Sequence, residues 1–242
     1  MKNKSLITSF TLIIVLALTL SYAQNTSKTE DTNKKQVKIY AEDSDIPYGD
    51  TNKIITLKEN VKINHEDIEV KSDYVEYNKK KNIANSPGKI FVTSDDFNIE
   101  ADKGTGDFDN KICKAQNNVK ALLKRSFISK IENKDKRSDV EKEITDDIRI
   151  TSDYAELDYK NKIITAKGNV IIKEKNRTIN ADNVKYNINT EIFYLNGNVT
   201  GIDENNQTFS SQGEVVISIK DGNEYIKAPQ AVFSFFVDTE EE

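Results

Sequence analysis

The chain has 242 residues, with 35 basic and 40 acidic side chains and a formal net charge of −5. Binding to nucleic acid depends on neutralising phosphates with a basic stripe, so an acidic chain with well-mixed charges argues against a nucleic-acid partner. The single cysteine excludes an internal disulfide, so packing and backbone hydrogen bonds must hold the fold together.

The first 23 residues have the order of an export signal. Lys2 and Lys4 precede an apolar run from Leu6 to Leu20, and small residues just before Gln24 suit cleavage after Ala23. The alternative is an uncleaved membrane anchor, because the apolar part is about long enough to span a bilayer if it tilts. Both readings place the rest of the chain outside the cytosol.

The segments that flank the main domain are polar. Residues 24–36 carry charges without apolar periodicity, which predicts a disordered leader. Residues 238–242 form a short acidic tail. The folded domain is therefore expected over residues 37–237.

Within this domain one unit recurs around an aspartate. Asp73, Asp102, Asp153 and Asp182 each follow an apolar-x-small triplet, at intervals of 29, 51 and 29 residues. The middle interval is longer because it contains a charged insertion at 125–147, which is interpreted as a solvated loop, with a docking arm for a membrane partner as the alternative. A period of this length is typical of repeat proteins, in which stacked units share one core.

Between the turns, apolar and polar residues alternate with the period of a β-strand. The parity of the alternation changes at each aspartate: Ile179 and Ala181 are odd-numbered, whereas Val184 and Tyr186 are even-numbered. A one-residue slip would turn every later side chain to the other face unless a bulge or corner restores it. The pattern predicts a bulge or corner at each aspartate, with the carboxylate bonded to nearby backbone amides. Calcium ligation is disfavoured because each unit offers one regular carboxylate.

Two all-β architectures fit these units, a parallel β-helix and an antiparallel meander curled into a jelly roll. Turns such as Gly168-Asn169 and Gly197-Asn198 are short. Short connections join antiparallel strands, whereas parallel strands in a flat sheet need long crossovers. Antiparallel sheets also hide one face and expose the other, as the alternation requires. The expected fold class is therefore an all-β jelly roll of repeated antiparallel strands.

The sequence contains no pattern that predicts catalysis. His65 is the only histidine and has no marked nucleophile or orienting acid nearby. Cys113 is interpreted as a small buried hydrophobe, and no Cys/His spacing indicates zinc. The pairs Asp95-Asp96 and Asp146-Asp147 are interpreted as solvated surface rather than glycosidase carboxylates. The prediction is a protein that is not an enzyme, with no catalytic residue, no metal and no cofactor.

The repeated phrases resemble those of a known family. "ITLKENVKI" with "VKSDYVEYN", "ITAKGNVII" with "INADNVKYN", and "YLNGNVTG" are similar to the units of the LptA / OstA-like family of lipopolysaccharide-transport proteins. The resemblance covers about residues 37–235, and the insertion and Pro229 depart from it. It implies a slightly twisted β-jelly roll in the periplasm. It also implies a groove between two sheets that carries the acyl chains of lipid A, and end-to-end stacking into a bridge between membranes.

The resemblance implies three partners: lipopolysaccharide, the inner-membrane anchor and the outer-membrane translocon of the pathway. It also implies that an uncleaved leader would make the chain the membrane-anchored member of the pathway. Saturated chains need apolar walls, so the candidate groove consists of the strand residues that are expected to face inward. These residues are Val61, Ile63, Ile90, Val92, Ile112, Val119, Ile163, Val170, Ile172, Ile192 and Val199. An ordinary closed sandwich core remains the alternative.

The first and last strand candidates, 37–42 and 230–237, would leave unpaired edges that invite another chain. The second is very apolar, so head-to-tail pairing between copies is expected. Two other classes of function remain open. One is a secreted parallel β-helix that acts on polysaccharide, and the other is a purely structural surface repeat.

Overall fold

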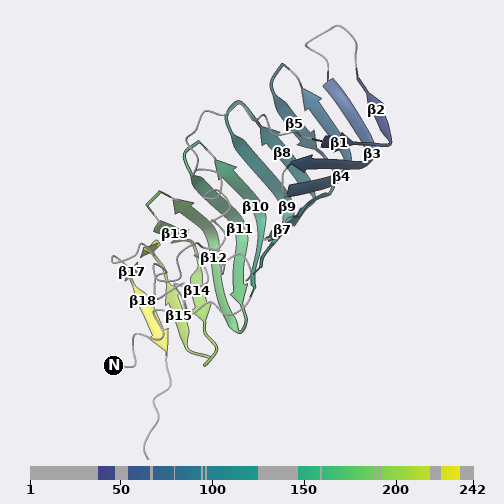
Figure 1. Cartoon of the computed structure of the whole chain (residues 1–242). Coiled ribbons are helices and arrows are strands. Elements are labelled where there is room, and N and C mark those ends of the chain that lie inside the picture. Colours follow the sequence, from purple (N-terminus) through teal and green to yellow (C-terminus); the bar gives the residue numbers. More distant parts are fainter. Residues whose placement is uncertain are drawn as a thin grey trace, which may run out of the picture.

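The computed structural model is an elongated all-β array in which every strand pair is antiparallel (Figure 1). It describes residues 38–46, 54–65, 68–78, 80–93, 95, 97–124, 147–158, 160–187, 189–190, 192–218 and 225–234. Within these residues, the antiparallel pairing shows that the parallel β-helix alternative is wrong. No helix in this part of the chain is long and apolar enough to cross a membrane.

Within the described residues, eighteen strands follow one another. Their bounds are β1 (Lys38–Tyr40), β2 (Asp43–Asp45), β3 (Ile54–His65), β4 (Ile68–Asn78), β5 (Ile83–Ser86), β6 (Ile90–Thr93), β7 (Phe97–Ala101), β8 (Lys103–Asp107), β9 (Ile112–Leu123), β10 (Ile148–Asp158), β11 (Ile163–Glu174), β12 (Arg177–Asn187), β13 (Ile192–Asn196), β14 (Val199–Ile202), β15 (Thr208–Ser211), β16 (Val215–Ser218), β17 (Tyr225–Lys227) and β18 (Ala231–Ser234).

The chain runs back and forth across the array and bends near the middle of each passage. Each long bent strand, or each pair of consecutive short strands, therefore contributes to two walls. We call the two sets of half-strands wall A and wall B. Wall A runs in the order β2, β3, β4, β5, β8, β9, β10, β11, β12, β13, β16, β17. Wall B runs in the order β1, β3, β4, β6, β7, β9, β10, β11, β12, β14, β15, β18.

The corners lie at the repeated aspartates, as the parity change predicted. Opposite Asp153 and Asp182 the register shifts, because two residues of the neighbouring strand face one aspartate. At the Asp182 corner, Gly197 and Asn198 have φ values of 74° and 49°. These left-handed conformations suit glycine and asparagine.

The carboxylates bond side-chain amides rather than the predicted backbone amides. Asn198 Nδ2 donates to Asp182 Oδ2 over 2.9 Å, and Asn118 Nδ2 donates to Asp102 Oδ2 over 2.6 Å. The backbone amide of Asp182 itself donates to the carbonyl of Gly197 over 2.8 Å. The aspartate of each repeated unit therefore stabilises the corner of the next strand.

A second regular element is the hairpin turn at the outer rim of wall A. Asp158 accepts hydrogen bonds from the backbone N–H and the side-chain amide of Asn161, which lower the pKa of the Asp158 carboxyl. Lys162 then adopts a φ of 59°, and Ile163 pairs with Asp158 in the ladder. The same arrangement joins Asp107, Asn110 and Ile112.

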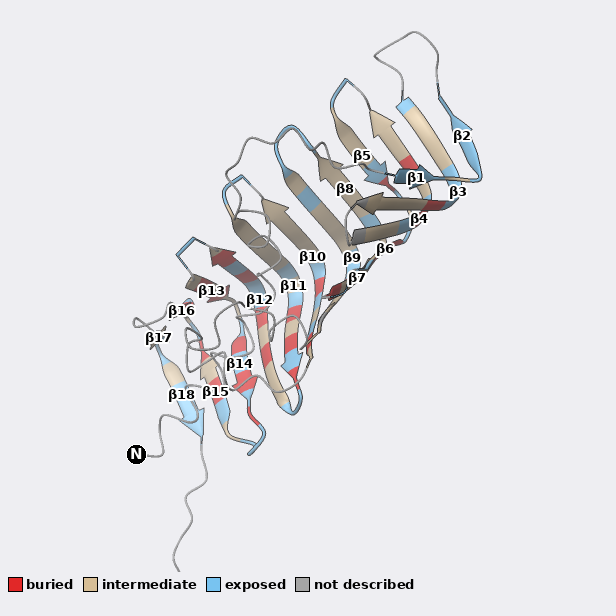
Figure 2. Cartoon of the chain, viewed as in Figure 1, coloured by how far each residue is buried: buried red, intermediate tan, exposed pale blue. Residues whose placement is uncertain are grey.

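Burial increases from the N-terminal to the C-terminal end of the array. Buried positions concentrate on β10 to β16, whereas β1 to β9 are mostly half-buried or exposed (Figure 2). The main core cluster joins wall B residues such as Ile172 and Ile179 to wall A residues such as Phe193 and Leu195. The two walls therefore pack against each other most fully in the C-terminal section.

Several sequence predictions lie outside the described residues. They are the signal or anchor at 1–23, the leader at 24–36, the insertion at 125–147 except for Asp147, and the acidic tail at 238–242.

Candidate functional site: the apolar groove

Two continuous ladders of side chains line the facing surfaces of the walls. In an antiparallel pair, residues directly opposite each other point to the same face. The wall B ladder runs Ile39, Ile63, Val70, Val92, Ile99, Ala121, Ile150, Ile172, Ile179, Gly201, Phe209, Phe233. The wall A ladder runs Ile55, Tyr77, Ala84, Gly106, Cys113, Leu157, Ile164, Tyr186, Phe193, Ile217, Ile226.

Most of the predicted groove residues lie on these facing surfaces. Those buried on wall B are Val61, Ile90, Val119, Val170, Ile172 and Val199. Ile63 and Val92 are half-buried members of the wall B ladder. The structure therefore brings these eight residues onto one apolar surface.

The other three predicted residues, Ile112, Ile163 and Ile192, lie on the opposite face of wall A, which is a correction to the inward set. Ile192 pairs with Asn187, whereas its neighbour Phe193 pairs with Tyr186 and is 1% exposed. The rings of Tyr186 and Phe193 stack with centroids 4.1 Å apart. Because Ile192 is the first residue after a hairpin turn, the inward positions start one residue later than the apolar pattern indicated.

A wide cavity opens at the N-terminal end of the groove, with a volume of about 880 Å³. Ile55, Leu57, Val75, Tyr77 and Ala84 line it from wall A, and Ile39 and Ile63 line it from wall B. Ile46 and Phe108 also line it and are 60% and 55% exposed. Large exposed apolar side chains around a cavity are typical of a binding site.

The polar side chains that line this cavity include Tyr77 and Asn82, and both are hydrogen-bonded. The hydroxyl of Tyr77 donates to Asn82 Oδ1 over 2.7 Å, and Asn82 Nδ2 donates to Asp109 Oδ1 over 2.7 Å. The rings of Tyr77 and Phe108 meet edge to face with centroids 6.2 Å apart. With these polar atoms engaged, the cavity offers an apolar surface to a ligand.

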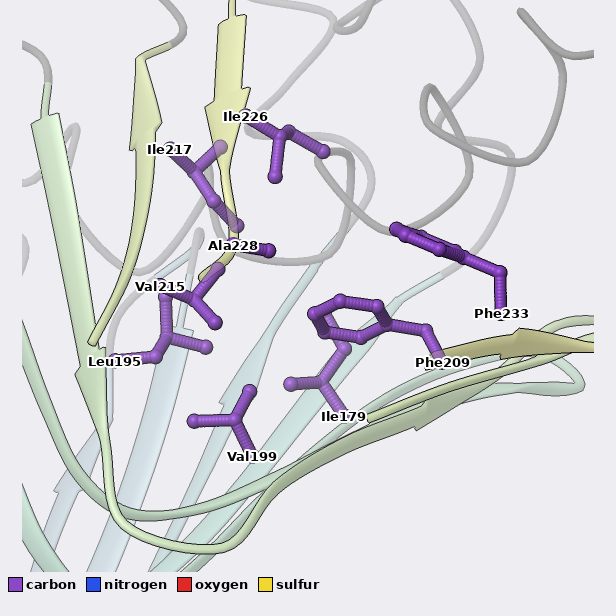
Figure 3. Close-up of a pocket in the computed structure, with 9 residues that line it drawn as sticks. All are labelled: Ile179, Leu195, Val199, Phe209, Val215, Ile217, Ile226, Ala228 and Phe233. Atoms are coloured by element: carbon purple, nitrogen blue, oxygen red, sulfur yellow. The ribbon is translucent and has the colours of Figure 1, made fainter. Parts of the chain in front are cut away.

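A smaller cavity of about 200 Å³ lies at the C-terminal end. Leu195, Val215 and Ile217 reach into it from wall A, and Ile179, Val199 and Phe209 reach into it from wall B (Figure 3). Phe233 of the last strand stacks at a tilt over Phe209 with centroids 5.2 Å apart. Bulky side chains thus fill most of the groove at this end.

Between the two cavities the walls touch. A Cβ atom built on Gly104 of wall A would lie 2.7 Å from Ile90 Cδ1 of wall B. Ile90 packs in a small cluster with Ala101 and Val119. The floor of the groove is therefore filled at this level, and only glycine leaves room for Ile90.

Cys113 lies on the wall A ladder and is exposed, not buried as predicted. Its ladder neighbours are Gly106 and Leu157, so the side chain faces the groove. The exposure follows from the small residues around it, since glycine and alanine leave the upper part of the groove unfilled here. Sequence reasoning missed this because the strand pattern does not show which residues lie beside Cys113 in the ladder.

A charged group borders the groove near β11 and β12. Glu174 is 1% exposed and lies 3.8 Å from Arg177, which lies 3.4 Å from Glu204. Oppositely charged partners make the burial of Glu174 tolerable. In the described part of the chain, no group of three or more His, Cys, Asp or Glu side chains is arranged to hold a metal ion.

Part of the sequence matches a known protein family. Residues 149–228 match the model of a family described as the LptA/(LptD N-terminal domain) LPS transport protein. Over these residues the sequence is similar to that family. The family consists of lipopolysaccharide-transport proteins and is not an enzyme family. The expected resemblance is thus confirmed, with the match confined to the C-terminal section.

Solved structures also match this chain. One is LptH from Pseudomonas aeruginosa, described as the LptA homologous periplasmic component of the conserved lipopolysaccharide transport device. It is 13% identical, and the match covers 50% of this chain and 75% of LptH with a TM-score of 0.37. Likeness at that level transfers no residue from one protein to the other. No curated protein matches the chain.

Proposed function

We propose that this protein is a periplasmic carrier of lipopolysaccharide that holds lipid acyl chains in the groove between walls A and B. The observation that carries the proposal is the pair of continuous apolar ladders, which open into a wide cavity at one end. A ladder of this kind needs no catalytic residue. The match to a lipopolysaccharide-transport family makes the acyl chains of lipid A the expected cargo.

The energetics of burial are sufficient for a carrier. Burying apolar surface gains roughly 0.8 kcal/mol per methylene, so one chain of about 12 carbons gains on the order of 10 kcal/mol before ordering costs. Groove positions such as Ile63, Leu57 and Val75 supply that surface in the wide cavity. Because the cargo must also leave, partial burial suits a carrier better than complete enclosure.

The experiment that tests the groove is photo-crosslinking in cells that make lipopolysaccharide. A photoreactive side chain at Ile63 faces the wide cavity, and one at the adjacent Lys62 faces outward. We expect a lipopolysaccharide adduct at Ile63 and none at Lys62. The pair Ile172 and Lys173 repeats the comparison in the C-terminal section. No adduct at either inward position, in an exported and folded protein, would contradict the proposal.

We also propose that the two ends of the array contact other proteins of the pathway or further copies of this chain. Among the described residues, β1 and β2 pair only with β3, while β17 and β18 pair only with β16 and β15. Val232 of β18 is 66% exposed and Ile39 of β1 is 54% exposed. Unpaired strand edges with exposed apolar residues favour strand addition.

Sedimentation of the mature chain over a wide concentration range tests this contact. We expect larger species at high concentration, and fewer of them when a charge is placed on the last strand by Val232→Lys. The matched control is Thr200→Lys, an exposed position in the same sheet that has a neighbour on each side. A protein that stays monomeric throughout would contradict the stacking of copies.

A further inference from the structure

The outer faces of the two walls differ in how their charges are paired. On the outer face of wall A, some residues that lie directly opposite each other carry opposite charges. Lys58 lies 3.6 Å from Asp43, and Lys114 lies 3.6 Å from Glu156. Cross-strand pairs of opposite charge stabilise a sheet, so these charges of wall A are balanced within the fold.

On the outer face of wall B, like charges lie opposite each other. Lys62 is directly opposite Lys71, and Arg149 is directly opposite Lys173. Lys62 and Lys71 share one carboxylate, that of Glu69. In the described part of the chain, Arg149 and Lys173 form no ion pair with a carboxylate. Like charges in such positions repel and lower the stability of a sheet, so this arrangement points to a partner outside the fold.

The outward residues of wall B from β1 to β11 form a surface that we call the basic face. Its basic residues are Lys38, Lys62, Lys71, Lys120, Arg149 and Lys173, and its acidic residues are Glu69 and Glu100. The face is therefore positive although the whole chain has a formal net charge of −5. Charges that are mixed along the sequence are separated here because alternate residues of a strand point to opposite faces.

Two aromatic side chains are exposed on the basic face. Tyr40 lies opposite Lys62, and Phe91 lies between Lys71 and Glu100 in the ladder. Exposed aromatic rings beside basic residues are typical of surfaces that bind at a membrane interface, where the rings reach the lipid and the cations reach the phosphates. The charge and the aromatic residues of this face thus match the same kind of partner.

We propose that the basic face binds the surface of a membrane that contains anionic phospholipid. Lys62, Lys71, Lys120, Arg149 and Lys173 lie against the lipid phosphates, and the rings of Tyr40 and Phe91 enter between the headgroups. The proposal goes beyond the carrier function, because it uses the outer side of wall B and not the groove. The inner side of the same strands lines the groove, so binding in this orientation holds the groove close to the bilayer.

The first test measures co-sedimentation of the mature chain with vesicles. We expect binding to phosphatidylglycerol vesicles and none to phosphatidylcholine vesicles, with an affinity that falls as salt is added because surface charges are screened. A basic residue near an anionic surface raises the affinity about fivefold, so Lys120→Gln combined with Lys173→Gln should weaken binding about 25-fold.

The matched control combines Lys103→Gln with Lys185→Gln. Both lysines are exposed on the outer face of wall A, and this double variant has the same net charge as the variant of the basic face. It should bind the vesicles as the unaltered chain does. Lys173→Gln alone should not lower the urea midpoint of unfolding, because it removes the repulsion with Arg149. Weaker binding without weaker folding then excludes misfolding as the cause.

The second test uses fluorescence. The chain has no tryptophan, so Phe91→Trp places a single tryptophan on the basic face. Its emission should shift to shorter wavelength with phosphatidylglycerol vesicles, because the ring leaves water. Ile54→Trp is the control, since Ile54 is exposed on the outer face of wall A, and its emission should not change.

Several outcomes would overturn the proposal. Equal weakening of vesicle binding in the two double variants would show that net charge alone decides it. Displacement by glycerol 3-phosphate, at an ionic strength where sodium chloride has no effect, would assign the face to separate phosphate groups. Tighter binding to duplex DNA than to the vesicles would assign it to another polyanion. Vesicle binding that survives in the variant of the basic face, together with a loss of self-association in sedimentation, would assign it to a second copy of the chain.

None of these outcomes bears on the groove. The carrier function is tested separately by the lipopolysaccharide adduct at Ile63, which lines the wide cavity on the inner side of wall B.

Discussion

The N-terminal section, residues 38–124, and the C-terminal section, residues 147–234, are built from the same bent strands but are filled differently. In the C-terminal section, Tyr186, Phe193 and Phe209 are buried between the walls. At comparable inward positions of the N-terminal section, wall A carries Ala84 and Gly106. The comparison shows that the corners and turns set the path of the chain, while side-chain size decides whether the space between the walls is a core or a groove.

The difference also shows at the surface. Three exposed large apolar side chains of the N-terminal section, Ile39, Ile46 and Phe108, line a cavity. In the C-terminal section the two most exposed large apolar side chains, Val232 and Phe233, lie on the last strand. The first set suits a ligand, and the second suits a strand edge that joins a partner.

The largest expected effect comes from one phenylalanine in each section. Phe193→Ala removes a side chain that is 1% exposed and should lower the free energy of unfolding by about 3–5 kcal/mol, because it leaves a cavity in a packed core. Phe108→Ala removes an exposed side chain and should change stability by less than about 0.5 kcal/mol while weakening fatty-acid binding. Urea unfolding and a binding titration measure both. Equal destabilisation by the two variants would remove the distinction between the sections.

The next effect concerns one corner glycine in each section. Gly197 has a φ of 74°, and a Cβ there would lie 2.2 Å from Asp182 Oδ2, so Gly197→Ala should cost about 1–3 kcal/mol of unfolding free energy. Gly88, at the equivalent corner of the N-terminal section, has no atom within 4 Å of its Cβ position. Gly88→Ala should therefore change stability by less than about 0.5 kcal/mol.

A double-mutant cycle separates the clash at Gly197 from the backbone strain. In a background of Asp182→Ala, the cost of Gly197→Ala should fall because the carboxylate is absent, while the part due to the positive φ remains. An unchanged cost would assign the whole effect to the backbone.

A smaller effect is expected at the asparagines of the corners, where the two sections should behave alike. Asn198→Ala and Asn118→Ala each remove a hydrogen bond to an aspartate and place alanine at a positive φ, so each should cost about 1 kcal/mol of unfolding free energy. Replacement by glycine at either position keeps the conformation and should cost less. A large difference between the two asparagines in urea unfolding would show that their corners are not equivalent.

The smallest effect concerns two tyrosines at equivalent places on the outer face of wall A. Burial, then the hydrogen bond to Glu156, raises the pKa of Tyr154 to about 12, and the hydrogen bond to Glu76 is the main cause of the raised pKa of Tyr74. A raised pKa means that the fold favours the neutral phenol. The resulting stability is present below about pH 10, the usual pKa of tyrosine, and is lost as the pH rises through about 12.

Tyr154→Phe should remove this alkaline dependence, as measured by thermal unfolding between about pH 9 and 12. Absorbance of tyrosinate in Tyr74→Phe and Tyr154→Phe assigns the two ionisations. A Tyr154 that ionises with ordinary solvent-exposed tyrosines would contradict the burial at this position.

Much of the fold could be predicted from local sequence. The strand alternation, the Gly-Asn turns and the parity change at each aspartate predicted antiparallel strands with corners at Asp153 and Asp182, and the register confirms them. The final unit departs from the pattern at Pro229, and the corner is kept because Gln230 takes a φ of 50° and Ser211 donates to the Pro229 carbonyl over 2.7 Å. A different residue can therefore serve the same corner when the backbone conformation is preserved.

The residues that face into the groove were harder to predict, because the hairpin turns decide whether the odd-numbered or the even-numbered residues of a strand point inward. After Asp158, the positive φ of Lys162 and the pairing of Ile163 with Asp158 put that isoleucine outside and Ile164 inside. Both residues are isoleucine, so the apolar pattern contains no information on which of them faces inward.

The sequence by itself determined the bent antiparallel strand, its repeat and its corners, because these depend on alternation and on residues that tolerate a left-handed backbone. Only the tertiary structure decided where the groove is deep, since that depends on pairs such as Ile90 and Gly104 that meet across the two walls. Residues on opposite walls pack by volume and not by sequence order, so neither the wide N-terminal cavity nor the exposed Cys113 has a local signal.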